Sequence, residues 1–174
     1  MSYQLVRTAR EFGPNLHAER NLRYGDYAYT IHLQTVANFG KYFRHLLQIS
    51  TDQAYEVEAA LWLHDTIEDC GINYQKIKTL FNENVAEYVW SVTGFGRNRV
   101  ERNASVEERI KGKIIPTYIK LCDKLANMVF SKYLDSNSGM YEKYVAEWSS
   151  FKEKYYLPDL KEMFDYVDNL IDLK

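Results

Sequence analysis

Cysteine, proline and glycine are all scarce in this sequence of 174 residues. The two cysteines, Cys70 and Cys122, are too few for a disulfide framework, and three prolines and eight glycines are too few for a loop-dominated or disordered chain. No apolar run approaches the ~18 residues that span a membrane, and no secretory signal opens the sequence. We therefore expect a cytoplasmic protein that does not enter a membrane and keeps both thiols reduced.

A strong charge of either sign is absent as well. The net charge is -2 and the pI is about 6.1, so no global basic field attracts duplex nucleic acid or an anionic membrane. A substrate that carries phosphates would have to be attracted by a local cluster of cations or by a metal ion. With 46% hydrophobic and 26% charged residues, the chain has the composition of one globular domain, which we place at residues 1–174. The oligomeric state does not follow from these features.

What the sequence does contain is helical spacing. Apolar residues recur three and four positions apart along nearly every segment, and no segment shows the sustained alternation of a half-buried strand. The pattern predicts an all-α fold, a compact single-domain bundle of about seven or eight helices. Its main predicted parts are a helix over 3–21 broken at Gly13–Pro14, a connector over 23–30, a helix over 31–49, a helix from a cap at Thr51 or Asp52 to Cys70, a short helix capped by Asn73, and a loop over 93–105.

An adjacent histidine and aspartate, His64 and Asp65, follow the apolar stretch 59–63. A carboxylate in so apolar a setting is costly unless a cation or hydrogen-bond donors lie close to it. A divalent metal ion meets that need and accepts imidazole and carboxylate together. Taken alone the dipeptide predicts little, but Glu68 and Asp69 follow three and four residues later on the same helix face. These acidic groups would repel one another without a cation, so the segment favours a metal site.

Two further residues complete a set of ligands. His32 lies near the start of the helix predicted from residue 31, and Asp123 lies in the apolar segment Ile119–Met128. Each has an ordinary explanation on its own, because a histidine is common at a helix start and Asp123 could pair with Lys120 or Lys124. Together with His64 and Asp65 they predict a site for one divalent ion. The remaining histidines, His17 and His45, lack an acidic and apolar setting, and we interpret both as non-ligands.

The order of these ligands resembles the pattern of HD-domain phosphohydrolases. Residues 64–71, HDTIEDCG, resemble the HD-x-x-ED-T segment of RelA/SpoT-type alarmone hydrolase domains, and residues 119–128, IKLCDKLANM, resemble their KLADRLHNM segment. Residues 23–32, RYGDYAYTIH, resemble a third segment, RKSGEPYIxH. The resemblance spans roughly residues 15–150, with HD-x-x-ED as its most specific part, and it is greatest to the small stand-alone alarmone hydrolases.

The resemblance implies a metal-dependent hydrolase, with one manganese ion bound by His32, His64, Asp65 and Asp123. It implies removal of the 3′-pyrophosphate from guanosine tetra- or pentaphosphate, which gives GDP or GTP and pyrophosphate. Glu68 and Asp69 then become the catalytic acids. A bound metal lowers the pKa of water, and a neighbouring carboxylate orients or deprotonates that water.

The same resemblance suggests residues that bind the small nucleotide substrate. Arg23 would meet the charge on the attacked phosphorus, Tyr29 would line the nucleoside pocket, and Asn127 would contact the ribose or a water on the metal. Arg97, with its neighbours Arg99 and Arg102 in the predicted loop, would hold distal phosphates. Tyr144, near the C-terminus, would line the nucleoside pocket.

Several positions depart from the family pattern. Tyr24 replaces a lysine and Ala126 replaces a histidine, while Ala28 and Leu33 replace prolines. No predicted metal ligand is lost, but Tyr24 and Ala126 lie near the expected pocket. Related small hydrolases act on adenosine alarmones, pyrophosphorylated tRNA ends or NADPH, so the resemblance leaves the exact nucleotide open.

Two other functions remain as alternatives. An HD-type 5′-nucleotidase or (d)NTP phosphohydrolase would share the four ligands, but the paired Glu68 and Asp69 favour the alarmone branch. An inactive HD module that binds a nucleotide or a partner, as an antitoxin does, is the second alternative. Metal content and reaction products distinguish these three functions.

Overall fold

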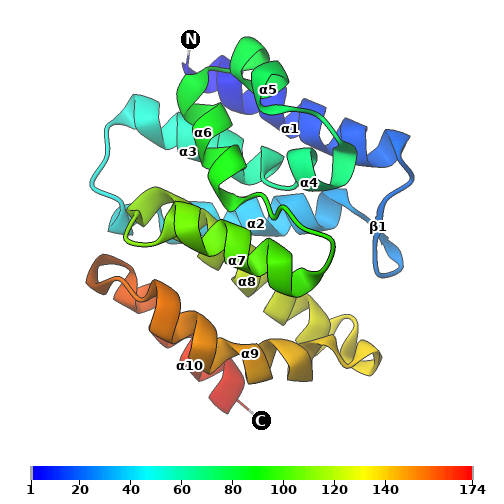
Figure 1. Ribbon diagram of the computed structural model, residues 1–174, viewed down its shortest axis with the longest axis vertical. Coiled ribbons are helices and arrows are strands. Elements are labelled where there is room, and N and C mark those ends of the chain that lie inside the picture. The colour runs from blue at the N-terminus through cyan, green and yellow to red at the C-terminus, as the bar shows by residue number, and fades with distance from the viewer. Residues whose placement is uncertain (1, 174) are drawn as a thin grey trace.

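Helices make up most of the chain, as the apolar spacing predicts (Figure 1). The computed structural model describes residues 2–173. Within that part of the chain, the α-helices are α1 (Ser2–Glu19), α2 (Thr30–Tyr42), α3 (Thr51–Leu63), α4 (Thr66–Cys70), α5 (Tyr74–Leu80), α6 (Glu83–Val92), α7 (Arg99–Ile110), α8 (Ile114–Tyr133), α9 (Met140–Tyr155) and α10 (Lys161–Asp172). The predicted all-α class is confirmed. Among residues 2–173 no helix is long and apolar enough to cross a bilayer.

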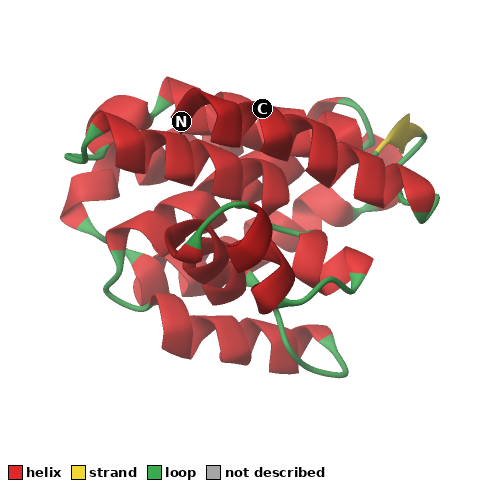
Figure 2. Ribbon diagram, turned by 90° about the horizontal axis from the view of Figure 1, so that it is seen from above, coloured by secondary structure: helices red, strands yellow, loops and turns green. Residues whose placement is uncertain are grey.

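The predicted connector between the first two helices contains the described strands. β1 (Arg23–Tyr24) pairs antiparallel with β2 (Tyr27–Ala28), and Tyr24 faces Tyr27 in the register. Gly25 has φ +55° in the turn between them, the left-handed region that glycine adopts without strain. Figure 2 shows this hairpin at one edge of an otherwise helical molecule. The hairpin leads directly into the start of α2, which carries His32.

Side-chain caps fix where several helices begin. Asn73 accepts a hydrogen bond from the backbone N–H of Lys76 at 2.9 Å, so the predicted cap of α5 is confirmed. The cap of α3 is Ser50 rather than Thr51 or Asp52, because the Ser50 hydroxyl accepts from the N–H of Gln53. The prediction was wrong by one or two residues, since all three residue types can cap a helix.

The segment predicted as a loop over 93–105 is partly helical. Asn98 accepts a hydrogen bond from the N–H of Glu101 at 3.0 Å and starts α7 at Arg99. Arg102 therefore projects from a helix, whereas Arg97 precedes it. The helix predicted over 31–49 is also shorter, since α2 ends at Tyr42.

The predicted break at Gly13–Pro14 is absent, because α1 continues through both residues. A side chain at position 13 would place its Cβ 2.4 Å from the carbonyl oxygen of Trp62 in α3. Glycine therefore lets α1 pack closely against α3, and that packing overrides the weak helix propensity of the pair.

The helix predicted to run to Cys70 is interrupted in its middle. α3 ends at Leu63, and α4 begins after Asp65, whose backbone lies at φ -94° and ψ -3°. α4 in turn ends at Gly71, which has φ +63°. The interruption places His64 and Asp65 at a corner between two helices.

The core surrounds the helices that carry the predicted ligands. α2 packs against both α3 and α8, and these three helices bury most of their apolar side chains (Figure 1). α9 and α10 pack on the outer side of α8. The fully buried side chains in this centre include Leu33, Leu61, Leu63, Ile119, Leu121 and Leu125. A rigid apolar support of this kind holds the polar residues between α2, α3 and α8 in fixed positions.

Candidate metal centre

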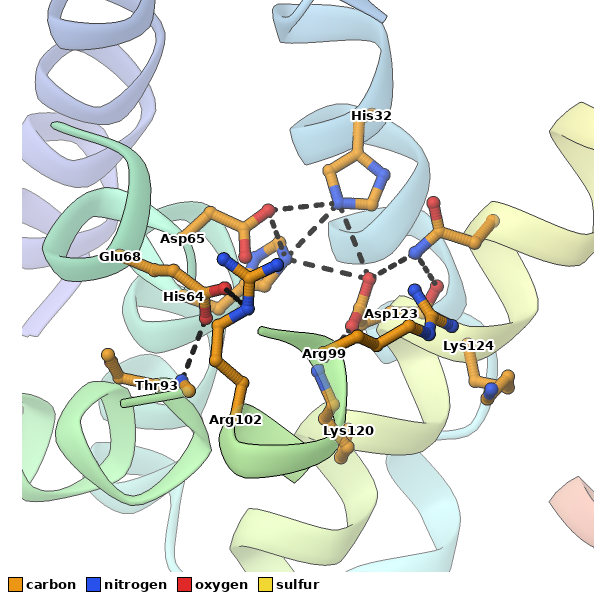
Figure 3. A network of polar contacts seen from close by, with 12 residues as sticks. His32, His64, Asp65, Glu68, Thr93, Arg99, Arg102, Lys120, Asp123 and Lys124 are labelled. Atoms are coloured by element: carbon orange, nitrogen blue, oxygen red, sulfur yellow. Dashed lines mark hydrogen bonds and ion pairs between the residues drawn. The ribbon is translucent and has the colours of Figure 1, made fainter. Parts of the chain in front are cut away.

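The four predicted metal ligands lie together between three helices. His32 lies on the first turn of α2, His64 and Asp65 lie at the corner between α3 and α4, and Asp123 lies in the middle of α8. Figure 3 shows their side chains pointing toward one another. Residues 91 positions apart in the sequence, His32 and Asp123, are thus brought within direct contact.

Distances among the donor atoms fit a single ion. Nε2 of His32 lies 3.2 Å from Nε2 of His64 and 3.3 Å from Oδ2 of Asp65, and the last two atoms are 3.0 Å apart. Oδ1 of Asp123 lies 3.5 Å from Nε2 of His32 and 3.8 Å from Nε2 of His64. Ligands bound about 2.0–2.2 Å from one metal ion are separated from one another by about 3.0–3.6 Å. His32, His64 and Asp65 alone form a group that could hold a metal ion, and Asp123 extends it.

Hydrogen bonds, burial and neighbouring charges set the protonation of these donor atoms. Nδ1 of His64 lies 2.9 Å from the carbonyl oxygen of Leu61, so this nitrogen keeps its proton, and Nε2 is the atom that would lose its proton to bind a metal ion. Burial lowers the pKa of His64, but Asp65 and Asp123 outweigh burial and raise it to about 9. Burial also opposes ionisation of Asp65, yet His64 and His32 hold the pKa of its carboxyl well below the usual range. The cluster therefore requires positive charge at its centre, which a divalent ion supplies.

The hydroxyl of Tyr29 lies within hydrogen-bond distance of two carboxylates, one of which belongs to a predicted metal ligand. This oxygen lies 2.7 Å from Oδ2 of Asp65 and 3.0 Å from Oδ2 of Asp69. The Tyr29 ring stacks on the buried ring of His17, with centroids 4.3 Å apart and planes inclined by 7°. His17 and His45 both lie outside the candidate metal-binding group, and their interpretation as non-ligands stays a prediction.

Glu68 lies beside the cluster, close to a loop and to α7. Its Oε2 accepts a hydrogen bond from the backbone N–H of Gly94 at 2.8 Å, and its Oε1 lies 3.5 Å from Nε of Arg102 (Figure 3). A Cβ at position 94 would lie 2.9 Å from Oε2 of Glu68, so glycine permits this approach. Burial raises the pKa of Glu68, which makes its carboxylate a stronger base.

A cavity of about 290 Å³ adjoins Glu68 and Asp123. α7, α8 and α9 line it with cations, an amide and aromatic rings, among them Arg99, Arg102, Lys120, Lys124, Asn127 and Tyr144. Glu147 of α9 accepts two hydrogen bonds from Arg99, at 3.0 and 2.7 Å, and lies 3.7 Å from Nζ of Lys124. Lys124 is only 10% exposed and lies 5.1 Å from the centre of the Tyr144 ring. Such a cavity suits an anionic ligand that also carries a ring.

The predicted substrate residues fall into two groups. Asn127 and Tyr144 line the cavity. Arg23 instead donates a hydrogen bond to the carbonyl of Asp26 within the hairpin, and Tyr29 is bonded to carboxylates as described above. Arg97 is 91% exposed and pairs with Glu101. The structure does not bring these three residues to the cavity, and their contact with substrate stays a prediction.

The fold brings charged residues to the cavity that the sequence did not identify as part of a site, among them Lys124 and Glu147. From the sequence alone, Lys124 was predicted only as a possible partner of Asp123, although a lysine inside the apolar segment Ile119–Met128 is itself a signal of a polar site. Glu147 carried no signal, because its place in the cavity depends on how α9 packs against α8.

Comparisons with known proteins agree with the fold and with the overall sequence resemblance. The chain is 31% identical over 130 residues to the guanosine-3′,5′-bis(diphosphate) 3′-pyrophosphohydrolase of Aquifex aeolicus (strain VF5), a match that covers 71% of this chain and 17% of that protein's length. A solved structure described as a metazoan orthologue of SpoT that hydrolyses ppGpp and plays a role in starvation responses covers 98% of this chain and 97% of its own, with a TM-score of 0.70 and 18% identity. No family model matches the sequence. The predicted resemblance to RelA/SpoT-type hydrolase domains is confirmed.

Proposed function

We propose that this chain, which resembles RelA/SpoT-type hydrolase domains in sequence and in fold, removes the 3′-pyrophosphate from guanosine tetra- or pentaphosphate or a related nucleotide. The products would be the nucleotide with a free 3′-hydroxyl and pyrophosphate. The observation that carries this proposal is the convergence of four metal-donor atoms beside Glu68, next to a cavity lined by cations. The names of the similar proteins support the choice of substrate class.

One divalent ion, manganese in our proposal, would be held by His32, His64, Asp65 and Asp123. Such an ion would lower the pKa of a water molecule bound to it and would neutralise charge on the phosphate oxygens. Imidazole and carboxylate donors suit manganese as well as other divalent ions, so the identity of the metal is part of the proposal.

The chain's own residues perform the proton transfer and meet the charge. Glu68 accepts a proton from the attacking water, whose oxygen bonds to the phosphorus attached to the ribose 3′-oxygen. The bond between that phosphorus and the 3′-oxygen breaks, the 3′-oxygen takes up a proton from solvent, and Glu68 releases its own proton to solvent. Arg102, 3.5 Å from Glu68, and Lys120, on the cavity wall, meet the charge that develops on the phosphate oxygens.

The rest of the nucleotide would occupy the cavity between α7, α8 and α9. Arg99 and Lys124 would contact its other phosphates, and Tyr144 would pack on the nucleoside. Asn127 lines the cavity and is hydrogen-bonded to Asp123, so it would contact the ribose of the bound nucleotide. The net charge of -2 does not favour duplex nucleic acid, so we propose a free nucleotide as the substrate. The cytoplasm is the location that we propose for this reaction.

The test is incubation of the Mn²⁺-loaded protein with guanosine and adenosine alarmones, NADPH and dNTPs, with chromatographic identification of the products. The proposal predicts pyrophosphate and a 3′-hydroxyl nucleotide from at least one 3′-pyrophosphorylated substrate. Asp65→Ala should lose both the metal and the activity, whereas His45→Ala on the surface should keep both. Triphosphate or orthophosphate released from the 5′ position would instead indicate a nucleotidase, and a folded wild-type protein without metal or turnover would indicate a binding module.

A further inference from the structure

Tyr24 ends strand β1 of the hairpin, and its side chain reaches α8. Its ring centroid lies 3.9 Å from that of Phe130 in α8 and 4.7 Å from that of His32 in α2. Its hydroxyl donates a hydrogen bond to Oδ1 of Asn127 at 2.9 Å. Tyr24 therefore joins the hairpin to the two helices that carry His32 and Asp123.

The Asn127 amide is oriented by Asp123 on its nitrogen side and supported by Tyr24 on its oxygen side. Asn127 lies one turn after Asp123, and its Nδ2 donates to Oδ1 of Asp123 at 2.5 Å. A carboxylate only accepts hydrogen bonds, so the amide nitrogen must face Asp123 and the amide oxygen must face away. The hydroxyl of Tyr24 is the donor that this oxygen meets. A rotated amide would lose the hydrogen bond to the Asp123 carboxylate and bring two oxygens together.

The orientation of Asp123 depends in turn on Asn127. Oδ2 of Asp123 accepts a hydrogen bond from Nζ of Lys120 at 2.8 Å, while Oδ1 points toward His32 and receives the amide of Asn127. Both oxygens are thus fixed, and Oδ1 is left with a lone pair directed at the two histidines.

We propose that Tyr24 is a positioning residue of the metal centre, acting through Asn127 to hold Asp123 in its ligating orientation. This inference rests on the metal-dependent function proposed above. Tyr24 thereby serves the metal centre, whereas the cations that line the cavity come from α7, α8 and α9. Residues that orient metal ligands typically change metal affinity by about 10–100-fold when they are removed.

The experiment measures Mn²⁺ affinity by titration calorimetry of the metal-free full chain. Tyr24→Phe removes only the hydroxyl and keeps both ring contacts, and Asn127→Ala removes the next member. The double variant Tyr24→Phe/Asn127→Ala completes a cycle that tests whether the two act in series. Tyr141→Phe is the matched control, because the Tyr141 hydroxyl donates to the carbonyl of Leu170, away from the metal centre.

Tyr24→Phe should weaken Mn²⁺ binding about tenfold, and the double variant should bind no more weakly than Asn127→Ala alone. The visible absorption of Co²⁺-loaded Tyr24→Phe should also shift from the wild-type spectrum, while thermal unfolding of the metal-free protein stays close to wild type. Tyr141→Phe should leave affinity and spectrum unchanged. Wild-type affinity in Tyr24→Phe, or losses in the two single variants that multiply in the double variant, would overturn the inference and leave the proposed function standing. Failure of the wild type to bind any divalent ion would overturn both.

Discussion

The hydroxyl of Tyr29 lies 2.7 Å from Oδ2 of Asp65. A residue expected to line the nucleoside pocket is therefore hydrogen-bonded to a predicted metal ligand. The same hydroxyl lies 3.0 Å from Oδ2 of Asp69, so two carboxylates share it. Because one hydroxyl donates one proton, the stronger share of this hydrogen bond belongs to the nearer oxygen, that of Asp65. Tyr29 therefore supports the orientation of the Asp65 carboxylate.

Tyr29→Phe is expected to weaken Mn²⁺ binding about tenfold, because Asp65 loses a donor while the stacking on His17 remains. Titration calorimetry of the metal-free protein measures the effect. Tyr74→Phe serves as the control, since the Tyr74 hydroxyl donates to Glu87 on the surface. Unchanged Mn²⁺ affinity together with a raised KM would return Tyr29 to the role of a substrate contact.

Glu68→Gln is expected to retain the metal and to lower kcat by about 10²–10⁴-fold, since glutamine keeps an acceptor for the N–H of Gly94 but cannot take a proton from water. Metal analysis and steady-state kinetics on the same preparation test both halves of this prediction. Glu87→Gln on the surface provides the control. A variant with the wild-type rate would exclude Glu68 as the base.

Arg99 and Arg97 make a matched pair for testing which arginine binds phosphate. Arg99 lines the cavity and is half-exposed, whereas Arg97 is 91% exposed and pairs with Glu101. Arg99→Gln is expected to raise KM about tenfold or more, the effect of losing a charged hydrogen bond, and to leave metal binding intact. Arg97→Gln should change KM by less than about twofold, as expected for a solvated charge. A larger effect at Arg97 would mean that the substrate lies over the loop before α7.

Asp168 gives a prediction about stability and pH. Burial raises its pKa, but Lys152 and the indole N–H of Trp148 outweigh burial and hold the pKa below the usual range. A carboxyl whose pKa is lower in the folded state stabilises the fold above its unfolded pKa, and this contribution is lost as pH falls through the folded value. Asp168→Asn should therefore lower Tm at neutral pH, and the difference from wild type should shrink below about pH 4. A difference that stays constant with pH would contradict this role.

Much of the metal centre could be predicted from the sequence because its residue types conflict with their surroundings. His64, Asp65 and Asp123 stand among apolar residues, where only a polar function justifies them. The sequence could not show that the helix breaks between Leu63 and Thr66, since no glycine or proline marks the corner. That interruption depends on tertiary packing and on the bond between His64 and the carbonyl of Leu61.

The cavity was harder to predict than the metal centre. The loop predicted over 93–105 includes Arg99, whereas the Asn98 side chain caps a helix that begins at Arg99. Lys124 and Glu147 meet only when α9 packs on α8, and a contact between such distant positions follows no local pattern. The hairpin contacts of Tyr24 and Tyr29 are of the same kind.

The most direct test of the proposed reaction follows oxygen from solvent into product. The Mn²⁺-loaded protein would be incubated with guanosine tetraphosphate in water enriched in heavy oxygen, and the products weighed by mass spectrometry. Attack of water on the phosphorus next to the 3′-oxygen predicts labelled pyrophosphate and unlabelled GDP. Labelled orthophosphate, loss of a 5′ phosphate, or label in the nucleoside would contradict the proposed reaction.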